Sequence, residues 1–117
     1  MSEEVTIYFN PQCSKCRLTL DLLETRGQQP EIVEYLESPP DAATLESILD
    51  MLGLEPRDLM RSFEKEYTQA GLDNPGLSRA ELIDVMITYP RLIQRPIVVK
   101  NGKAAIGRPP EKVIDIL

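Results

Sequence analysis

Two cysteines, Cys13 and Cys16, carry the most reactive chemistry in this sequence, where they form a CxxC motif. The motif follows a run of β-branched and aromatic residues and precedes a helical pattern, so it should lie where a strand ends and a helix begins. Unpaired N–H groups and the helix dipole at that position stabilise a thiolate over a thiol. We therefore predict that Cys13 is a nucleophile and that Cys16, one turn further on, is more buried. The competing interpretation is two small core residues in a chance match.

Neighbouring polar residues support the prediction of a reactive loop. Lys15 and Arg17 add positive charge beside the thiols, which favours the thiolate. Asn10 precedes the motif, and its amide either holds the reactive loop, hydrogen-bonds a cysteine sulfur, or simply ends the strand as a turn residue.

Two arginines stand where they could bind an oxyanion near the motif. Arg95 directly precedes Pro96 at the start of a strand pattern, and Arg108 directly precedes two prolines. The planar guanidinium group suits tetrahedral oxyanions, and helix N-termini supply further N–H donors. We expect the sheet to place both arginines near Cys13.

The hydrophobic periodicity and the turn residues indicate the elements that position these groups. Two strands separated by a helix should run parallel, and a block of helices follows them. A hairpin around Asn101-Gly102 and a terminal helix complete the pattern. The expected strands are 5–9, 31–35, 96–100 and 103–106, and the expected helices are 16–26, 41–52, one or two short helices within 56–74, one after a capping box at Ser78 and Glu81, and 110–117.

This order of elements predicts a thioredoxin-like α/β fold. The mixed four-stranded sheet carries a helical insertion between strands two and three, at about residues 41–90, within a single domain of residues 1–117. In such folds the proline before the third strand is cis and faces the reactive cysteine. Pro96 occupies this place, so we predict a cis Arg95-Pro96 bond.

The composition excludes several classes of function. The 117 residues include no histidine, which removes imidazole base catalysis, Ser-His-Asp triads and His-ligated zinc, and we expect no metal site. A net charge of −6 argues against direct nucleic-acid binding unless basic groups cluster on one face. Without a long apolar run or a basic, apolar leader, we expect a cytoplasmic protein with no membrane association. The charge run Glu64-Lys65-Glu66 is interpreted as a solvated helix face.

Several segments together resemble the glutaredoxin-linked arsenate reductases of the ArsC type. The resemblance runs almost from end to end, in order and at similar spacing. The segments are IYFNPQC at 7–13, EYLESPP at 34–40, LMR at 59–61, LIQRPIVV at 92–99, GRP at 107–109 and DIL at 115–117.

This resemblance implies a catalytic cysteine at Cys13 and three oxyanion-binding arginines at Arg61, Arg95 and Arg108. In the implied reaction the thiolate forms a Cys–S–As(V) adduct, glutathione attacks it, and glutaredoxin reduces the mixed species as arsenite leaves. The implied substrate is arsenate or a similar oxyanion. Glutathione is a co-substrate rather than a bound cofactor, glutaredoxin or thioredoxin is the reductant, and the protein is expected to be a monomer.

Two positions depart from the well-known reductases of this type. Phe9 stands where they have a histidine thought to help ionise the cysteine, and Cys16 stands where they have serine. Cys16 could resolve the Cys13 adduct as a disulfide. It also suits two alternatives: a redox-sensing regulator of the related Spx type, which binds RNA polymerase, and a general thiol-disulfide oxidoreductase. The arginines and the Gly107-Arg108-Pro109 turn favour the reductase interpretation.

Overall fold

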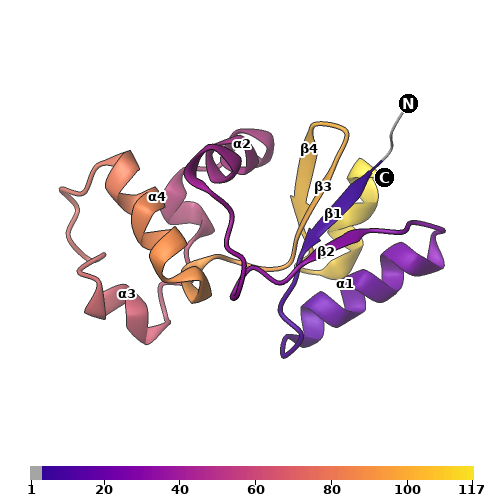
Figure 1. Cartoon of the computed structure of the whole chain (residues 1–117), viewed down its shortest axis with the longest axis horizontal. Helices are drawn as coiled ribbons and strands as arrows, with labels where there is room; N and C mark the ends of the chain where they lie inside the picture. The colour runs from indigo at the N-terminus through magenta and orange to yellow at the C-terminus, as the bar shows by residue number, and fades with distance from the viewer. Residues whose placement is uncertain (1–3) are drawn as a thin grey trace. The chain divides into compact units, whose positions relative to one another are not determined.

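The computed structural model describes residues 4–117, and its internal contacts divide the chain into two compact units. The sheet unit contains the chain up to Ser38 together with Arg95–Leu117, and the helical unit is Pro39–Gln94 (Figure 1). The helical unit corresponds to the predicted insertion. Every helix within residues 4–117 is too short or too polar to cross a membrane.

The sheet unit has the predicted mixed topology. Its strands are β1 (Val5–Tyr8), β2 (Glu31–Val33), β3 (Ile97–Lys100) and β4 (Lys103–Ile106). They lie in the order β2-β1-β3-β4, with β1 parallel to β2 and antiparallel to β3, and β3 antiparallel to β4. The thioredoxin-like α/β prediction is therefore confirmed, although β1 and β2 end one and two residues earlier than predicted.

The hairpin between β3 and β4 turns at the predicted residues. Asn101 and Gly102 have φ angles of 52° and 75°, as a type I′ turn requires at both central positions. This turn pairs Lys100 with Lys103 and sets the register in which Val98 faces Ala105.

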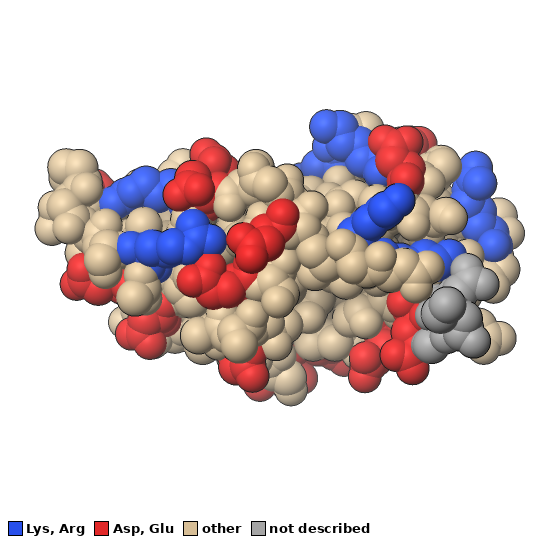
Figure 2. Space-filling model, turned by 90° about the horizontal axis from the view of Figure 1, so that it is seen from above, with Lys and Arg blue, Asp and Glu red and all other residues tan. Residues whose placement is uncertain are grey.

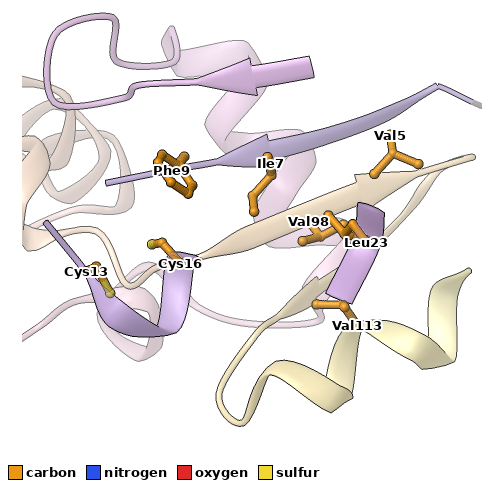
Figure 3. Packing of buried hydrophobic residues seen from close by; sticks show 8 residues of the cluster. All are labelled: Val5, Ile7, Phe9, Cys13, Cys16, Leu23, Val98 and Val113. Atoms are coloured by element: carbon orange, nitrogen blue, oxygen red, sulfur yellow. The ribbon is translucent and has the colours of Figure 1, made fainter. Parts of the chain in front are cut away.

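Two helices pack against one face of this sheet. Helix α1 is Ser14–Thr25, which begins two residues earlier than predicted, and η3 (Pro110–Ile116) is a 3-10 helix. Residues from β1, β3 and both helices share one buried cluster: Val5, Ile7, Phe9, Cys13, Cys16, Leu23, Val98 and Val113 (Figure 3). Both cysteines therefore belong to the core on the side of the sheet that α1 covers.

The helical unit contains short helices, one of which begins at the predicted capping box. Its elements are α2 (Ala42–Leu52), η1 (Pro56–Leu59), α3 (Lys65–Gln69), α4 (Arg79–Thr88) and η2 (Pro90–Leu92). Asp41 caps α2 by accepting the Thr44 N–H at 2.8 Å. The capping box of Ser78 and Glu81 opens α4 as predicted.

Arg57 holds the irregular part of the helical unit together. Its guanidinium donates to the Leu72 carbonyl at 2.6 Å, the Asn74 carbonyl at 2.7 Å and the Tyr67 hydroxyl at 3.1 Å. These bonds connect η1 to α3 and to the segment that follows α3.

We expect Arg57→Ala to lower the free energy of unfolding by about 1 to 3 kcal/mol, because it leaves two carbonyl groups without a charged donor. Urea denaturation measures this change. Lys65→Ala, which removes an exposed cation from the same unit, serves as the matched control. Equal stability of the two variants would show that the Arg57 bonds do not stabilise the unit.

Candidate active site

Cys13 caps the N-terminus of α1 at the end of a short, hydrogen-bonded loop. The Cys13 N–H donates to the Asn10 carbonyl at 3.0 Å, and the Asn10 side-chain oxygen accepts the Gln12 N–H at 2.9 Å. Of the roles considered for Asn10, the structure thus shows the loop-holding one. Its backbone N–H, rather than its amide, points to the Cys16 sulfur at 3.5 Å.

The Cys13 thiol is poised to ionise near neutral pH. Burial raises its pKa, but the backbone N–H of Cys16, the Arg95 side chain, the Cys16 thiol and the backbone N–H of Lys15 all stabilise the thiolate, and the pKa falls to about 7. The N-terminus of α1 and an arginine therefore stabilise the Cys13 thiolate in this chain, which has no histidine at position 9. Phe9 instead packs in the core with the two cysteines (Figure 3).

Cys16 has the opposite character. It is completely buried, whereas Cys13 is 8% exposed. Burial, the hydrogen bond to Cys13 and the charge of Cys13 together outweigh the Asn10 N–H and Arg95, and they raise the pKa of Cys16 to about 12. The pair thus combines a thiolate that is slightly exposed with a fully buried, protonated thiol that donates to it.

The predicted contributions of Lys15 and Arg17 take a different form. Both side chains are exposed. Lys15 stabilises the thiolate through its backbone N–H. Arg17 turns to the Pro11 carbonyl, at 3.4 Å. Lys15 is therefore connected to the reactive thiol through its backbone, whereas Arg17 reaches the loop through its guanidinium.

Arg95 and Arg108 meet at Cys13, as the strand-end argument predicted. The Arg95 side chain hydrogen-bonds the Cys13 sulfur. Nη2 of Arg108 lies 3.7 Å from the same sulfur, while its Nε donates to the Arg95 carbonyl. The Arg95-Pro96 bond is cis as predicted, and the Arg108-Pro109 bond is also cis, which was not predicted.

Tyr35, shortly after β2, is a further neighbour of Arg95. It is 1% exposed, and its phenol favours the charged form of Arg95. Burial alone lowers the pKa of Arg95, but Tyr35 and the two cysteines reverse this effect and raise it. The sequence pattern around Tyr35 does not distinguish a tyrosine that interacts with Arg95 from one that only packs in the core.

Arg61 belongs to the helical unit, where it is almost buried. Its Nε donates to Glu64 at 3.1 Å, its Nη1 donates to Gln94 at 2.9 Å, and its guanidinium lies 4.5 Å from the ring centre of Phe63. Backbone bonds from Arg61 N–H to Leu92 and from Gln94 N–H to Leu59 hold these two segments together.

The interpretation of Glu64-Lys65-Glu66 as a solvated helix face is wrong for both glutamates. Their side chains are each 13% exposed, and both form ion pairs with Arg91, as Glu64 also does with Arg61. Burial raises the pKa of Glu64, but Arg61 and Arg91 outweigh it and lower the pKa. Short-range patterns could not reveal pairing with Arg91, which lies far along the chain.

Figure 2 shows one face of the molecule, on which Lys and Arg side chains lie among Asp and Glu side chains. Within residues 4–117, His, Cys, Asp and Glu side chains form no group of three or more that could hold a metal ion.

The titration of Cys13 sets an expected pH dependence for its alkylation. Because iodoacetamide reacts with the thiolate, the rate should rise with pH, reach half its maximum near pH 7 and level off above it. Peptide mapping should place the label on Cys13 rather than on the buried Cys16. A midpoint at the ordinary value of about 8.5 would show that the loop does not activate Cys13.

Comparison with known proteins identifies relatives along the whole chain. The model of the ArsC family matches residues 8–116. An Escherichia coli K12 protein with the name uncharacterized protein YfgD is 52% identical over 118 residues, covering 100% of this chain and 99% of that protein. A Neisseria meningitidis protein named arsenate reductase is 46% identical over 115 residues, covering 97% of this chain and 98% of that protein.

Solved structures agree with this result. The arsenate reductase from Vibrio cholerae superimposes with a TM-score of 0.95 at 46% identity, and the match covers 100% of both chains. Family model, sequence relatives and backbone geometry therefore coincide, and the chain belongs to the ArsC family.

Proposed function

We propose that this protein reduces arsenate to arsenite, with Cys13 as the nucleophile. The observation that carries the proposal is the pair of arginine side chains at the Cys13 sulfur, Arg95 by a hydrogen bond and Arg108 at 3.7 Å. A thiolate repels an anionic substrate, and fixed guanidinium groups offset this repulsion as charge develops. The arsenate reductases named among the relatives support the choice of oxyanion.

In the proposed first step the Cys13 thiolate attacks arsenic and displaces one hydroxyl group of arsenate, which takes a proton from the solvent and leaves as water. The product is a Cys13–S–As(V) adduct whose remaining oxygens are held by Arg95 and Arg108. Arg61 is the third arginine that we assign to the oxyanion, and the support for it is its position in the sequence pattern of the ArsC family.

Cys16 is proposed to become reactive only after the adduct forms. Burial raises the pKa of Cys16 most, and the hydrogen bond to Cys13 and the charge of Cys13 raise it further. The two contributions from Cys13 end when its sulfur is bonded to arsenic, whereas the burial and the Arg95 charge that favours a thiolate remain. The Cys16 thiolate would then attack the Cys13 sulfur, forming a disulfide while the S–As electron pair leaves with arsenic as arsenite.

Glutathione offers a second route from the same adduct. Its thiol attacks the adduct in place of Cys16, and glutaredoxin reduces the mixed species. Either route consumes two electrons, which matches the reduction of As(V) to As(III). We place this reaction in the cytoplasm, where glutathione and thioredoxin keep thiols reduced.

A coupled assay of the purified protein tests the proposal. NADPH oxidation is followed with glutathione, glutaredoxin and glutathione reductase, with either arsenate or a small disulfide as the oxidant. We expect turnover with arsenate. Turnover with the disulfide above that of the coupling enzymes alone, without turnover with arsenate, would instead support a general thiol-disulfide oxidoreductase, the second function that the hydrogen-bonded Cys13-Cys16 pair favours. Turnover with neither oxidant would contradict both enzymatic functions and favour a redox-sensing regulator.

A further inference from the structure

Gly107 lies where three segments of the sheet unit meet. It is buried, and its N–H donates to the Pro96 carbonyl at 2.9 Å. It directly precedes Arg108 and faces Thr19, a completely buried residue in the middle of α1. The turn that carries Arg108, the Arg95-Pro96 segment and helix α1 therefore come together at one residue without a side chain.

A side chain at position 107 would overlap two of these segments. A Cβ atom on Gly107 would lie 2.5 Å from Oγ1 of Thr19 and 2.8 Å from Cγ of Pro96. Non-bonded heavy atoms make their best contacts at about 3.5 to 4.0 Å, so both distances are severe overlaps. The φ angle of Gly107 is not in the left-handed region. Close approach, rather than backbone conformation, is thus the reason for glycine here.

The neighbours of Gly107 are fixed in place. The Thr19 hydroxyl donates to the Lys15 carbonyl at 2.7 Å, which orients the side chain toward its own helix. Pro96 is buried and follows directly on Arg95. A bulkier residue at 107 would therefore displace the turn or the Arg95-Pro96 segment rather than a flexible side-chain end.

Such a displacement would move both arginines that contact the Cys13 sulfur. Arg108 follows Gly107, and its guanidinium spans from the Arg95 carbonyl to the sulfur, with Nη2 at 3.7 Å. Arg95 precedes Pro96, and its side chain hydrogen-bonds the same sulfur. Both arginines thus depend on the spacing at residue 107.

We propose that Gly107 is a positioning residue, whose missing side chain allows Thr19 and Pro96 to approach closely enough to hold Arg95 and Arg108 at the Cys13 sulfur. The inference rests on the proposed function only where it treats these arginines as oxyanion ligands. Their effect on the Cys13 thiolate exists without any substrate, so it can be measured separately.

The test is the pH titration of the Cys13 thiolate by its absorbance near 240 nm in Gly107→Ala. We expect the midpoint to rise from about 7 toward the ordinary value of about 8.5. The KM for arsenate should rise as well. Gly76→Ala is the matched control, because its added Cβ meets only the Asn74 side-chain oxygen, at 3.3 Å, and it should titrate as the wild type does.

A second substitution tests whether the contact with Thr19 is the cause. Thr19→Ala removes Oγ1 and Cγ2 of Thr19, which the new Cβ would meet at 2.5 Å and 3.2 Å, so Gly107→Ala with Thr19→Ala should titrate closer to the wild type than Gly107→Ala does. A raised midpoint that Thr19→Ala leaves unchanged would overturn the part assigned to Thr19 and leave the overlap with Pro96 as the cause. A wild-type midpoint in folded Gly107→Ala would overturn the whole proposal.

If Gly107→Ala folds poorly, a substitution in α1 tests the same contact. Thr19→Ile enlarges the same contact and should also raise the midpoint, and an unchanged midpoint there would contradict the proposal. If the wild type fails to reduce arsenate while these midpoints move as expected, the arsenate proposal fails and the positioning role of Gly107 stands.

Discussion

Replacing Arg95 with alanine is expected to lower kcat/KM for arsenate by about 100- to 1,000-fold, the range measured when one fixed donor to a developing oxyanion is removed. Two effects add in this variant. The Arg95 hydrogen bond that favours the Cys13 thiolate is lost, so the pKa of Cys13 rises and less thiolate is present at neutral pH. One of the two guanidinium groups at the sulfur is lost as well.

The pH profile separates these two effects of Arg95→Ala. Raising the pH restores the thiolate but not the guanidinium, so activity should recover only in part at alkaline pH. Arg95→Lys keeps the charge without the planar fork and should fall between the wild type and alanine. Arg26→Ala, at an exposed position after α1, is the matched control. Full recovery of Arg95→Ala at high pH would contradict a role in binding the oxyanion.

Replacing Cys16 with serine is expected to give opposite results with two electron donors. With glutathione and glutaredoxin, Cys16→Ser should keep a measurable fraction of the activity, because glutathione attacks the Cys13 adduct directly. With thioredoxin, thioredoxin reductase and no glutathione, the activity should be lost, because no disulfide can form between residues 13 and 16. Serine keeps a hydroxyl donor at the position of the buried thiol, which limits the change at Cys13.

NADPH oxidation in the two coupled systems measures the result for Cys16→Ser, with Ser14→Ala as a control for changes in the same turn. Loss of activity with both donors would show that the dithiol route is obligatory. Equal activity with both donors would show that Cys16 takes no part in turnover.

Local patterns predicted the framework that carries the reactive cysteine. The β-branched run of β1, the capping box at Ser78 and the Asn101-Gly102 turn each encode their structure within a few residues, and the sequence places all three correctly. The CxxC motif likewise predicts that Cys16 is more buried than Cys13, because a strand end and a helix start fix both positions.

Contacts between distant segments could not be predicted in the same way. Arg108 bonds to the Arg95 carbonyl, and Gly107 requires space between Thr19 and Pro96, although nothing in the periodicity near any of these residues indicates the others. The groups that stabilise the Cys13 thiolate were likewise predicted only in part. The charges of Lys15 and Arg17 were expected to contribute, but backbone N–H groups and a strand-end arginine stabilise the thiolate.

The most direct test of the central claim is the rate of arsenite formation by the wild type beside Cys13→Ser. Both proteins are assayed with arsenate, glutathione and glutaredoxin, and circular dichroism shows that both are folded. We predict steady arsenite formation by the wild type and none above background by Cys13→Ser, because a serine hydroxyl neither ionises at this pH nor forms the disulfide whose formation supplies two electrons to arsenic. Equal arsenite formation by the two proteins, or none by the wild type with reduced thiols, would contradict the account.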